Sequence, residues 1–221
     1  MSRSDQMILD TLITDRTQHD VDRLKQLMAI PVQQMTQAQK DEYDGGVSAL
    51  QDSQNEDLYD SQNEQLFVAG GVQKGAYNYS DLNRVEEAVD YVADALVQAD
   101  TDLKAYATSL GVAWDTVYDL PYDPADYNLT VKTDWAVGDI PSATQMARYY
   151  SNLLLIQAAF LVYTAIPDSM GNLDYEGANN IEQMLLDEYQ ALQDGIELRE
   201  AMIRAAAECY KSGEFYSGEV Y

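Results

Sequence analysis

The residues best suited to chemistry are one histidine, one cysteine and many carboxylates. His19 stands among polar neighbours, and Cys209 is the only cysteine in the chain. A nucleophile needs a base beside it, and a zinc site needs several His or Cys ligands. We therefore expect His19 to be solvated and Cys209 to be a small core residue, and we predict no enzyme active site and no cofactor.

The carboxylates give no clear catalytic or metal-binding pattern. Pairs such as Glu86 and Asp90 are common simply because acidic residues are common. The segment "DSMGNLDYE" (168–176) offers oxygen ligands, but its spacing differs from a helix-loop-helix calcium loop, and Asp174 suits a helix N-cap. No phosphate-binding loop or dinucleotide fingerprint occurs either. The sequence therefore predicts no metal site.

The charge balance limits the kinds of partner. There are 38 acidic residues against 13 Lys and Arg, which gives a formal net charge of -25. Phosphate groups and anionic membranes are bound by clustered Lys and Arg, so we expect no nucleic-acid binding. The longest strongly apolar run, 153–166, is shorter than the roughly 20 residues of a membrane span, so we expect no membrane insertion. A solvated acidic surface, a DNA mimic, and a surface for divalent ions or basic partners remain open.

A regular apolar stripe predicts one long helix over 81–110. Its apolar residues follow alternating steps of three and four, typical of a helix that packs along one seam. Ser80 is the predicted N-cap, and Gly111 is a natural stop. Asn83 and Arg84 flank the stripe, where they are placed to hold the following loop or a neighbouring helix. The predicted helix-packing residues are Leu82, Val85, Val89, Val92, Leu96 and Leu103.

Four further helices are predicted. One runs from the capping pair Ser142 and Gln145 to Pro167, and because it is apolar nearly all round we expect it to be central. Another begins near Asp174 and runs toward Tyr210, with a bend expected near Gly195. Two short helices are expected near the N-terminus, over 17–30 and from Thr36 to Gly45.

The long helices are joined and followed by irregular segments. Residues 114–141 form a predicted Tyr/Asp-rich loop, which includes one short strand pair in our interpretation. Its tyrosines either form a contact surface or cover the end of the bundle. Residues 211–221, "KSGEFYSGEVY", contain two Gly-centred repeats and predict an extended C-terminal arm or a tight hairpin that leaves the bundle. Such an arm either adds a strand to another chain or frays in solution. The predicted partner-binding residues are Tyr118, Tyr122, Tyr127, Phe215, Tyr216, Val220 and Tyr221.

The predicted fold class is therefore mainly α, a bundle of three long helices. The N-terminal helical segment occupies 1–44, and an acidic insert with an octapeptide duplication ("DSQNEDLY", "DSQNEQLF") occupies 45–73. The bundle itself occupies 74–210 and the arm 211–221. Residues 41–73 carry eight acids and no Lys or Arg, so we expect a surface helix or an excursion from the bundle there.

Five segments resemble a known but uncharacterised family. In order they are "LITDRTQHDVDRLKQL", "KGAYNYSDLNRVEEAVDYVADAL", "KTDWAVGDIPSATQMARYYSNL", "NNIEQMLL" and "FYSGEVY". They resemble a helical module of tail-region proteins of bacteriophages and prophages of Gram-positive hosts, over roughly 10–42 and 74–221. The family has a shorter link where this chain has the acidic insert, and it carries no assigned catalytic residue.

The resemblance implies a virion component made in the host cytoplasm and built into the tail tip, the baseplate or a fibre attachment. Its partners would be other phage tail proteins and further copies of itself, as a trimer or hexamer. The alternative is an acidic DNA mimic that inhibits a nucleic-acid-binding protein of the host. The two differ in what they bind, since a mimic requires a basic partner.

Overall fold

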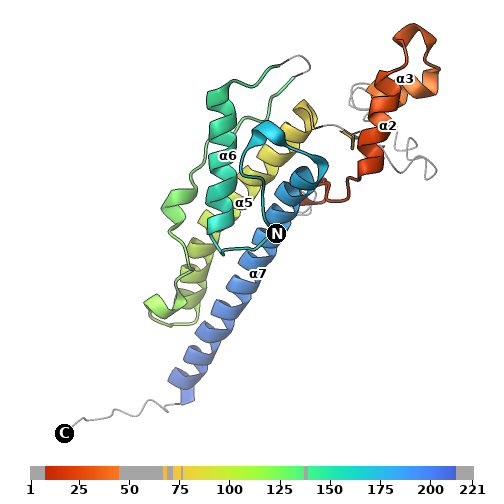
Figure 1. The fold of residues 1–221 in the computed structure, drawn as a ribbon. Coiled ribbons are helices and arrows are strands. Elements are labelled where there is room, and N and C mark those ends of the chain that lie inside the picture. Colours follow the sequence, from red (N-terminus) through yellow and green to blue (C-terminus); the bar gives the residue numbers. More distant parts are fainter. Residues whose placement is uncertain (1–7, 45–66, 69–71, 76, 137–138, 213–221) are drawn as a thin grey trace.

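Three long helices form the body of the protein (Figure 1). The computed structural model describes residues 8–44, 67–68, 72–75, 77–136 and 139–212. The long helices are α5 (Tyr79–Ser109), α6 (Ala143–Ala158) and α7 (Tyr175–Ser212). The predicted fold class, mainly α with three long helices, is confirmed.

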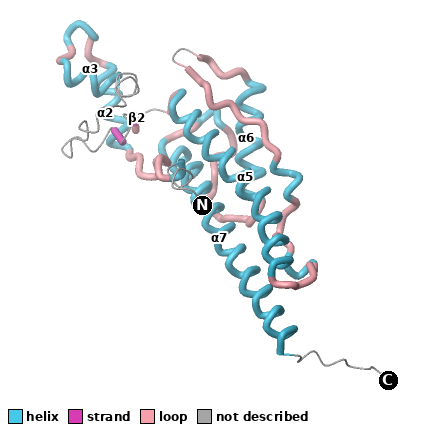
Figure 2. Tube along the Cα trace, turned by 180° about the vertical axis from the view of Figure 1, so that it is seen from behind, coloured by secondary structure: helices cyan, strands magenta, loops and turns pink. Residues whose placement is uncertain are grey.

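The three helices run in the same direction. Arg84 of α5 contacts Glu182 of α7, and seven residues further along each helix Tyr91 contacts Tyr189. Pairs that keep the same sequence offset show that α5 and α7 are parallel. The middle of α6 lies near the start of α5, because Tyr149 contacts Tyr77, and the segment after the end of α6 lies against the middle of α7. The connections 110–142 and 159–174 therefore run back along the bundle (Figures 1 and 2).

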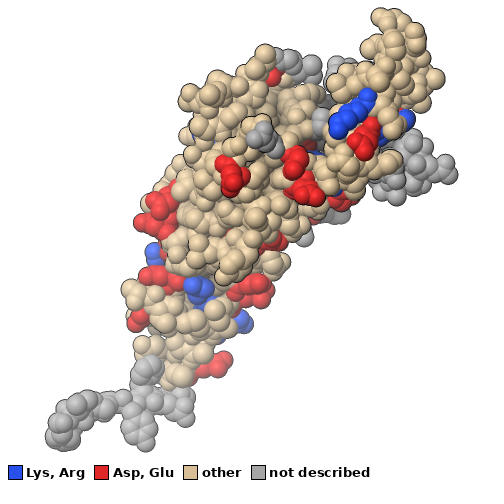
Figure 3. Space-filling view, viewed as in Figure 1, with Lys and Arg blue, Asp and Glu red and all other residues tan. Residues whose placement is uncertain are grey.

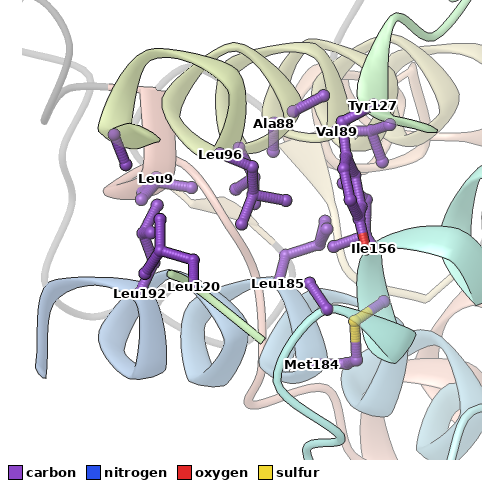
Figure 4. Close-up of a cluster of buried hydrophobic side chains, with 14 of the residues drawn as sticks. Leu9, Ala88, Val89, Leu96, Leu120, Tyr127, Ile156, Met184, Leu185 and Leu192 are labelled. Carbon is purple, nitrogen blue, oxygen red and sulfur yellow. The ribbon is translucent and has the colours of Figure 1, made fainter. Parts of the chain in front are cut away.

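The core lies between α5 and α7. Figure 4 shows Leu96 and Val89 of α5 facing Leu185 and Leu192 of α7, with Ile156 of α6 beside them. Burying one such side chain stabilises the fold by about 1.5–3 kcal/mol. All six residues of the predicted stripe are buried: Leu82, Val85, Val89, Val92, Leu96 and Leu103.

The start of α5 differs from the prediction by two residues. Asn78, not Ser80, is the N-cap, and its side chain accepts a hydrogen bond from the backbone N–H of Ser80. Asp81 completes the capping box by accepting from the N–H of Asn78. Asn83 forms two hydrogen bonds with the backbone of Trp135 and so holds the loop before α6, as expected.

The prediction for α6 was wrong in its length and its position. The helix ends at Ala158, not at Pro167, and the following turn passes through Leu161 at a φ of 56°. Leu154 and Leu155 are exposed on its outer side, so α6 is not central. The central partner of α5 is α7, whose Ile181, Leu185 and Leu192 are buried.

The N-terminal helices lie beyond one end of the bundle (Figure 1). They are α2 (Gln18–Met28), capped by Thr17 with Asp20 as predicted, and α3 (Gln37–Asp44). A 3-10 turn, Val32–Gln34, joins them. The strands β1 (Phe67–Val68) and β2 (Val72–Gln73) form a short antiparallel pair in which Phe67 is opposite Gln73 and Val68 opposite Val72. The octapeptide duplication and most of the 45–73 insert lie outside the described residues.

Two expectations for α7 were also wrong. The helix is continuous through Gly195, where a bend was expected. Gly195 has a packing role instead, because an added Cβ would lie 2.9 Å from Cε1 of Phe160. Cys209 is exposed, not buried, since it lies on the last turns of α7, beyond most of the core.

Candidate partner-binding surface

The most strongly charged site in the described residues is closed to solvent. Arg16 donates through Nη2 to Asp81 at 2.8 Å and to Glu182 at 2.6 Å, and Arg84 donates to the same two carboxylates. The four side chains are between 0% and 6% exposed. A substrate could not reach this cluster without unfolding around it. Its role is structural, because it joins the 8–16 segment to the starts of α5 and α7.

The buried Tyr149 and the half-buried Tyr77 extend this polar layer toward α6. The hydroxyls of Tyr77 and Tyr149 are hydrogen-bonded to each other. Burial raises the pKa of both phenols, and the nearby Glu182 raises each further. These hydroxyls therefore stay protonated, and they hold α6 to the start of α5 and do not transfer protons near neutral pH.

The loop between α5 and α6 packs onto the bundle through its aromatic residues. It contains the 3-10 turns Thr116–Tyr118 and Pro124–Tyr127, and its described residues form no strand. Tyr118 and Tyr127 are buried, and Tyr122 is half-buried and donates its hydroxyl to the carbonyl of Leu96. Of the two alternatives, Tyr118 and Tyr127 cover the bundle, so the prediction that these two contact a partner is wrong. The prediction for the half-buried Tyr122 stays a prediction.

Apolar side chains are exposed instead on α6 and in the turn that follows it. Leu154 and Leu155 are 43% and 40% exposed, Leu161 is 72% exposed and Tyr163 is fully exposed. Residues 149–166 contain no Asp, Glu, Lys or Arg. We call these four residues the α6 face. Large apolar side chains gathered in one short segment are typical of a protein contact site.

The turn that carries Leu161 and Tyr163 is held at both ends by acids of α7. Glu188 Oε1 accepts from the backbone N–H of Phe160 at 2.7 Å. The hydroxyl of Thr164 donates to Asp187, and Gln157 donates to the Thr164 carbonyl at 2.7 Å. The turn is thus fixed to the bundle although its apolar side chains point outward.

The backbone of the turn is strained at the same place. Leu161 is the one non-glycine residue with a positive φ in the described part of the chain. A left-handed leucine costs about 1–2 kcal/mol, and such strain is concentrated at functional sites. Here it turns Leu161 away from the bundle.

Glu188 lies in an aromatic surrounding beneath this turn. Its side chain is buried near Tyr122, Tyr127 and Phe160, and its Oε2 has no hydrogen-bond partner among the described residues. Burial raises the pKa of Glu188 to about 7, and the hydrogen bond from Phe160 opposes part of this rise. The carboxyl group therefore titrates near neutral pH, although it does not face a substrate-sized opening.

No other described feature forms a stronger site. A polar hollow near the end of α5 is lined by Asp100, Asp119, Asp123 and Lys104. Within the residues that the structure covers, no group of three or more His, Cys, Asp or Glu side chains is placed to hold a metal ion. His19 is exposed. The predicted contacts Phe215, Tyr216, Val220 and Tyr221 lie outside the described residues.

Comparisons with known proteins give no relative. Neither the family models nor the curated proteins nor the solved structures contain a match to this chain. Among the helices described, none is both long and apolar enough to cross a membrane. The uncharged run 149–166 is the only sequence signal for the α6 face. It does not identify that face, because the same run also fits a helix buried within its own bundle.

Proposed function

We propose that this protein acts by binding other proteins, as a structural component of a phage tail. The binding role is supported mainly by the α6 face, where a strained and clamped turn holds Leu161 and Tyr163 in solvent. Keeping such side chains exposed costs stability, and a partner that covers them recovers it. The assignment to the tail tip, the baseplate or a fibre attachment follows from the resemblance of the five quoted segments.

The closed charged cluster agrees with a structural role. Arg16 pairs with both Asp81 and Glu182, and the cluster leaves no open side for a substrate. Such a cluster fixes one arrangement of the elements around it. A rigid body with one exposed apolar face suits a component that fits between fixed neighbours.

The DNA-mimic alternative receives less support from the surface. Figure 3 shows acidic side chains in separate groups on the face drawn, with uncharged surface between them. A mimic of a phosphate backbone needs acids in continuous rows. This alternative predicts binding to a basic protein that weakens steeply as salt increases.

The proposal is tested by capturing the neighbouring tail proteins with the purified chain. The double variant Leu155→Ser and Tyr163→Ser removes two of the four apolar side chains of the α6 face, and neither belongs to the core. We expect the variant to lose at least tenfold in affinity for a tail partner, measured by sedimentation or calorimetry.

The matched control is Met28→Ser, because Met28 is 62% exposed but lies on α2, beyond one end of the bundle (Figure 1). The control variant should bind the tail partner as the unmodified chain does. Equal binding by all three proteins would show that the α6 face does not bind the tail partner. Failure of the unmodified chain to bind any tail protein would contradict the tail assignment.

A further inference from the structure

We propose that the α6 face is covered by residues 213–221 of a second copy of this chain. The inference rests on the proposed function, because it names the partner of the surface identified there. The segment "GEFYSGEVY" contains two apolar pairs, Phe215 with Tyr216 and Val220 with Tyr221. The α6 face also presents two apolar pairs, Leu154 with Leu155 and Leu161 with Tyr163.

The position where α7 ends argues against binding within one chain. Phe160 packs against Gly195, which places the turn after α6 at that level of α7. The helix continues to Ser212, 17 residues and about 25 Å beyond. Tyr216 follows Ser212 by four residues, which span at most about 14 Å. The first apolar pair therefore cannot reach the α6 face of its own chain.

The second apolar pair can reach the turn after α6 in its own chain, but it cannot reach the rest of the α6 face. Residues 213–221 span at most about 32 Å when fully extended. Leu154 lies more than a helical turn before Phe160, and thus farther from Ser212 than the turn itself. Both pairs of residues 213–221 can contact the α6 face together only when the face belongs to another copy.

The charge of the chain also favours this surface for self-association. Two copies with a net charge of -25 repel each other at most approaches. The run 149–166 carries no charged residue, so it adds no acid to the contact. Residues 213–221 contribute only Glu214 and Glu219, each beside an apolar residue. Contact between these two segments therefore brings few acids together.

Cross-linking between differently tagged copies tests the contact. One copy carries Tyr163→Cys and the other carries Tyr216→Cys, both with Cys209→Ser because Cys209 is exposed. On mild oxidation we expect a disulfide between the two tagged copies. Met28→Cys in place of Tyr163→Cys is the matched control, because Met28 is exposed on α2, and it should give at least tenfold less product.

The same cysteines placed in one chain separate the two geometries. A cross-link within that chain, independent of protein concentration, would overturn the proposal. A second measurement does not depend on the cysteines. The full chain should sediment as a multiple of 24.7 kDa, and a chain truncated after Ser212 should sediment with the mass of a single truncated chain. A truncated chain that remains oligomeric, or a full chain that is monomeric, would also overturn it.

The outcomes distinguish this inference from the proposed function. A monomeric full chain that still binds a tail protein through the α6 face retains the function and rejects the second copy as the occupant. An oligomer that depends on residues 213–221 but binds no tail protein supports the second copy as the occupant and contradicts the proposed function.

Discussion

At the scale of single residues, Arg16 is the side chain on which the attachment of the N-terminal segment depends. It pairs with Asp81 and Glu182 inside the molecule, and its Nη1 also donates to the carbonyl of Ile13 at 2.6 Å. Its Nε and the Nη1 of Arg84 have no hydrogen-bond partner among the described residues, so the cluster is not fully satisfied. A buried ion pair adds little net stability, but the loss of one partner leaves a buried charge uncompensated.

Replacement of Arg16 by methionine is therefore expected to lower the free energy of unfolding by about 3 kcal/mol. Urea denaturation measures this change. The control is Lys25→Ala, because Lys25 is 68% exposed and its contact with Asp22 spans 3.7 Å. The control should change the free energy by less than about 0.5 kcal/mol. Similar small effects for both variants would show that the cluster does not hold the 8–16 segment.

A second residue-scale prediction concerns Glu188. Its raised pKa means that the folded protein binds a proton more tightly than the unfolded chain does. This contribution to stability is fully present at acidic pH, below the ordinary pKa of a glutamate, and is lost as pH rises through about 7. Between pH 5 and pH 8 the loss should be about 1–3 kcal/mol.

The variant Glu188→Gln should make stability less dependent on pH over this range. The measurement is the difference between the unmodified and variant free energies of unfolding at pH 5 and at pH 8. Because all other acids are shared, their titration cancels in this comparison. A difference that is the same at both pH values would contradict the inferred titration of Glu188.

At the scale of elements, the close contact of α7 with the segment after α6 depends on one glycine. Alanine at position 195 would improve helix propensity by about 1 kcal/mol. However, its Cβ would lie 2.9 Å from the Phe160 ring. We expect Gly195→Ala to destabilise the protein by about 1–3 kcal/mol in thermal or chemical unfolding, because overpacking outweighs propensity.

The same substitution gives a different result when the ring is removed. In a Phe160→Leu background, Gly195→Ala should be neutral or stabilising, since the contact is no longer present. Such non-additivity is the sign of direct contact between two residues. Additive effects would show that the destabilisation by Gly195→Ala does not come from the contact with Phe160.

The helices themselves could be predicted where their signals are local. The capping box of Thr17 and Asp20, the cap at Ser142 and the stripe from Leu82 to Leu103 all lie within a few residues of the elements they define. The end of α6 could not be predicted, because Ala158 is followed by neither Gly nor Pro. The helix ends where the backbone N–H of Phe160 donates to Glu188, which is 28 residues further along the chain.

The candidate site was predictable only in part for the same reason. The buried role of Arg16 depends on residues 65 and 166 positions away. An apolar run such as 153–166 predicts burial but does not say whether its own chain or a partner covers it. The tyrosines of the 114–141 loop fit both a contact surface and a cover of the bundle. Their packing against the bundle, far away in the sequence, favours the cover.

At the scale of the whole molecule, the excess of 25 negative charges should govern association. Repulsion between copies is screened by salt, with a Debye length of about 10 Å at 0.1 M. Self-association through the uncharged α6 face is therefore expected to strengthen by several-fold between 50 and 500 mM NaCl. Sedimentation velocity across this range measures the change.

A DNA mimic behaves in the opposite way toward its target. Its binding to a basic protein should weaken across the same salt series, because the attraction itself is screened. Dissociation of the oligomer at high salt would show that charged contacts, and not the α6 face, hold the copies together.

Because the three long helices are parallel, their helix dipoles point in the same direction. Each helix behaves as if about half a positive charge stood at its N-terminus and half a negative charge at its C-terminus. In α5, α6 and α7 these dipoles point the same way and add. Asp81 lies in the first turn of α5, where it is favoured, and neither α5 nor α6 has a basic residue in its last turn to offset the opposite pole. Anionic groups of a neighbour are therefore favoured close to the N-terminal ends of these helices, and cationic groups close to their C-terminal ends.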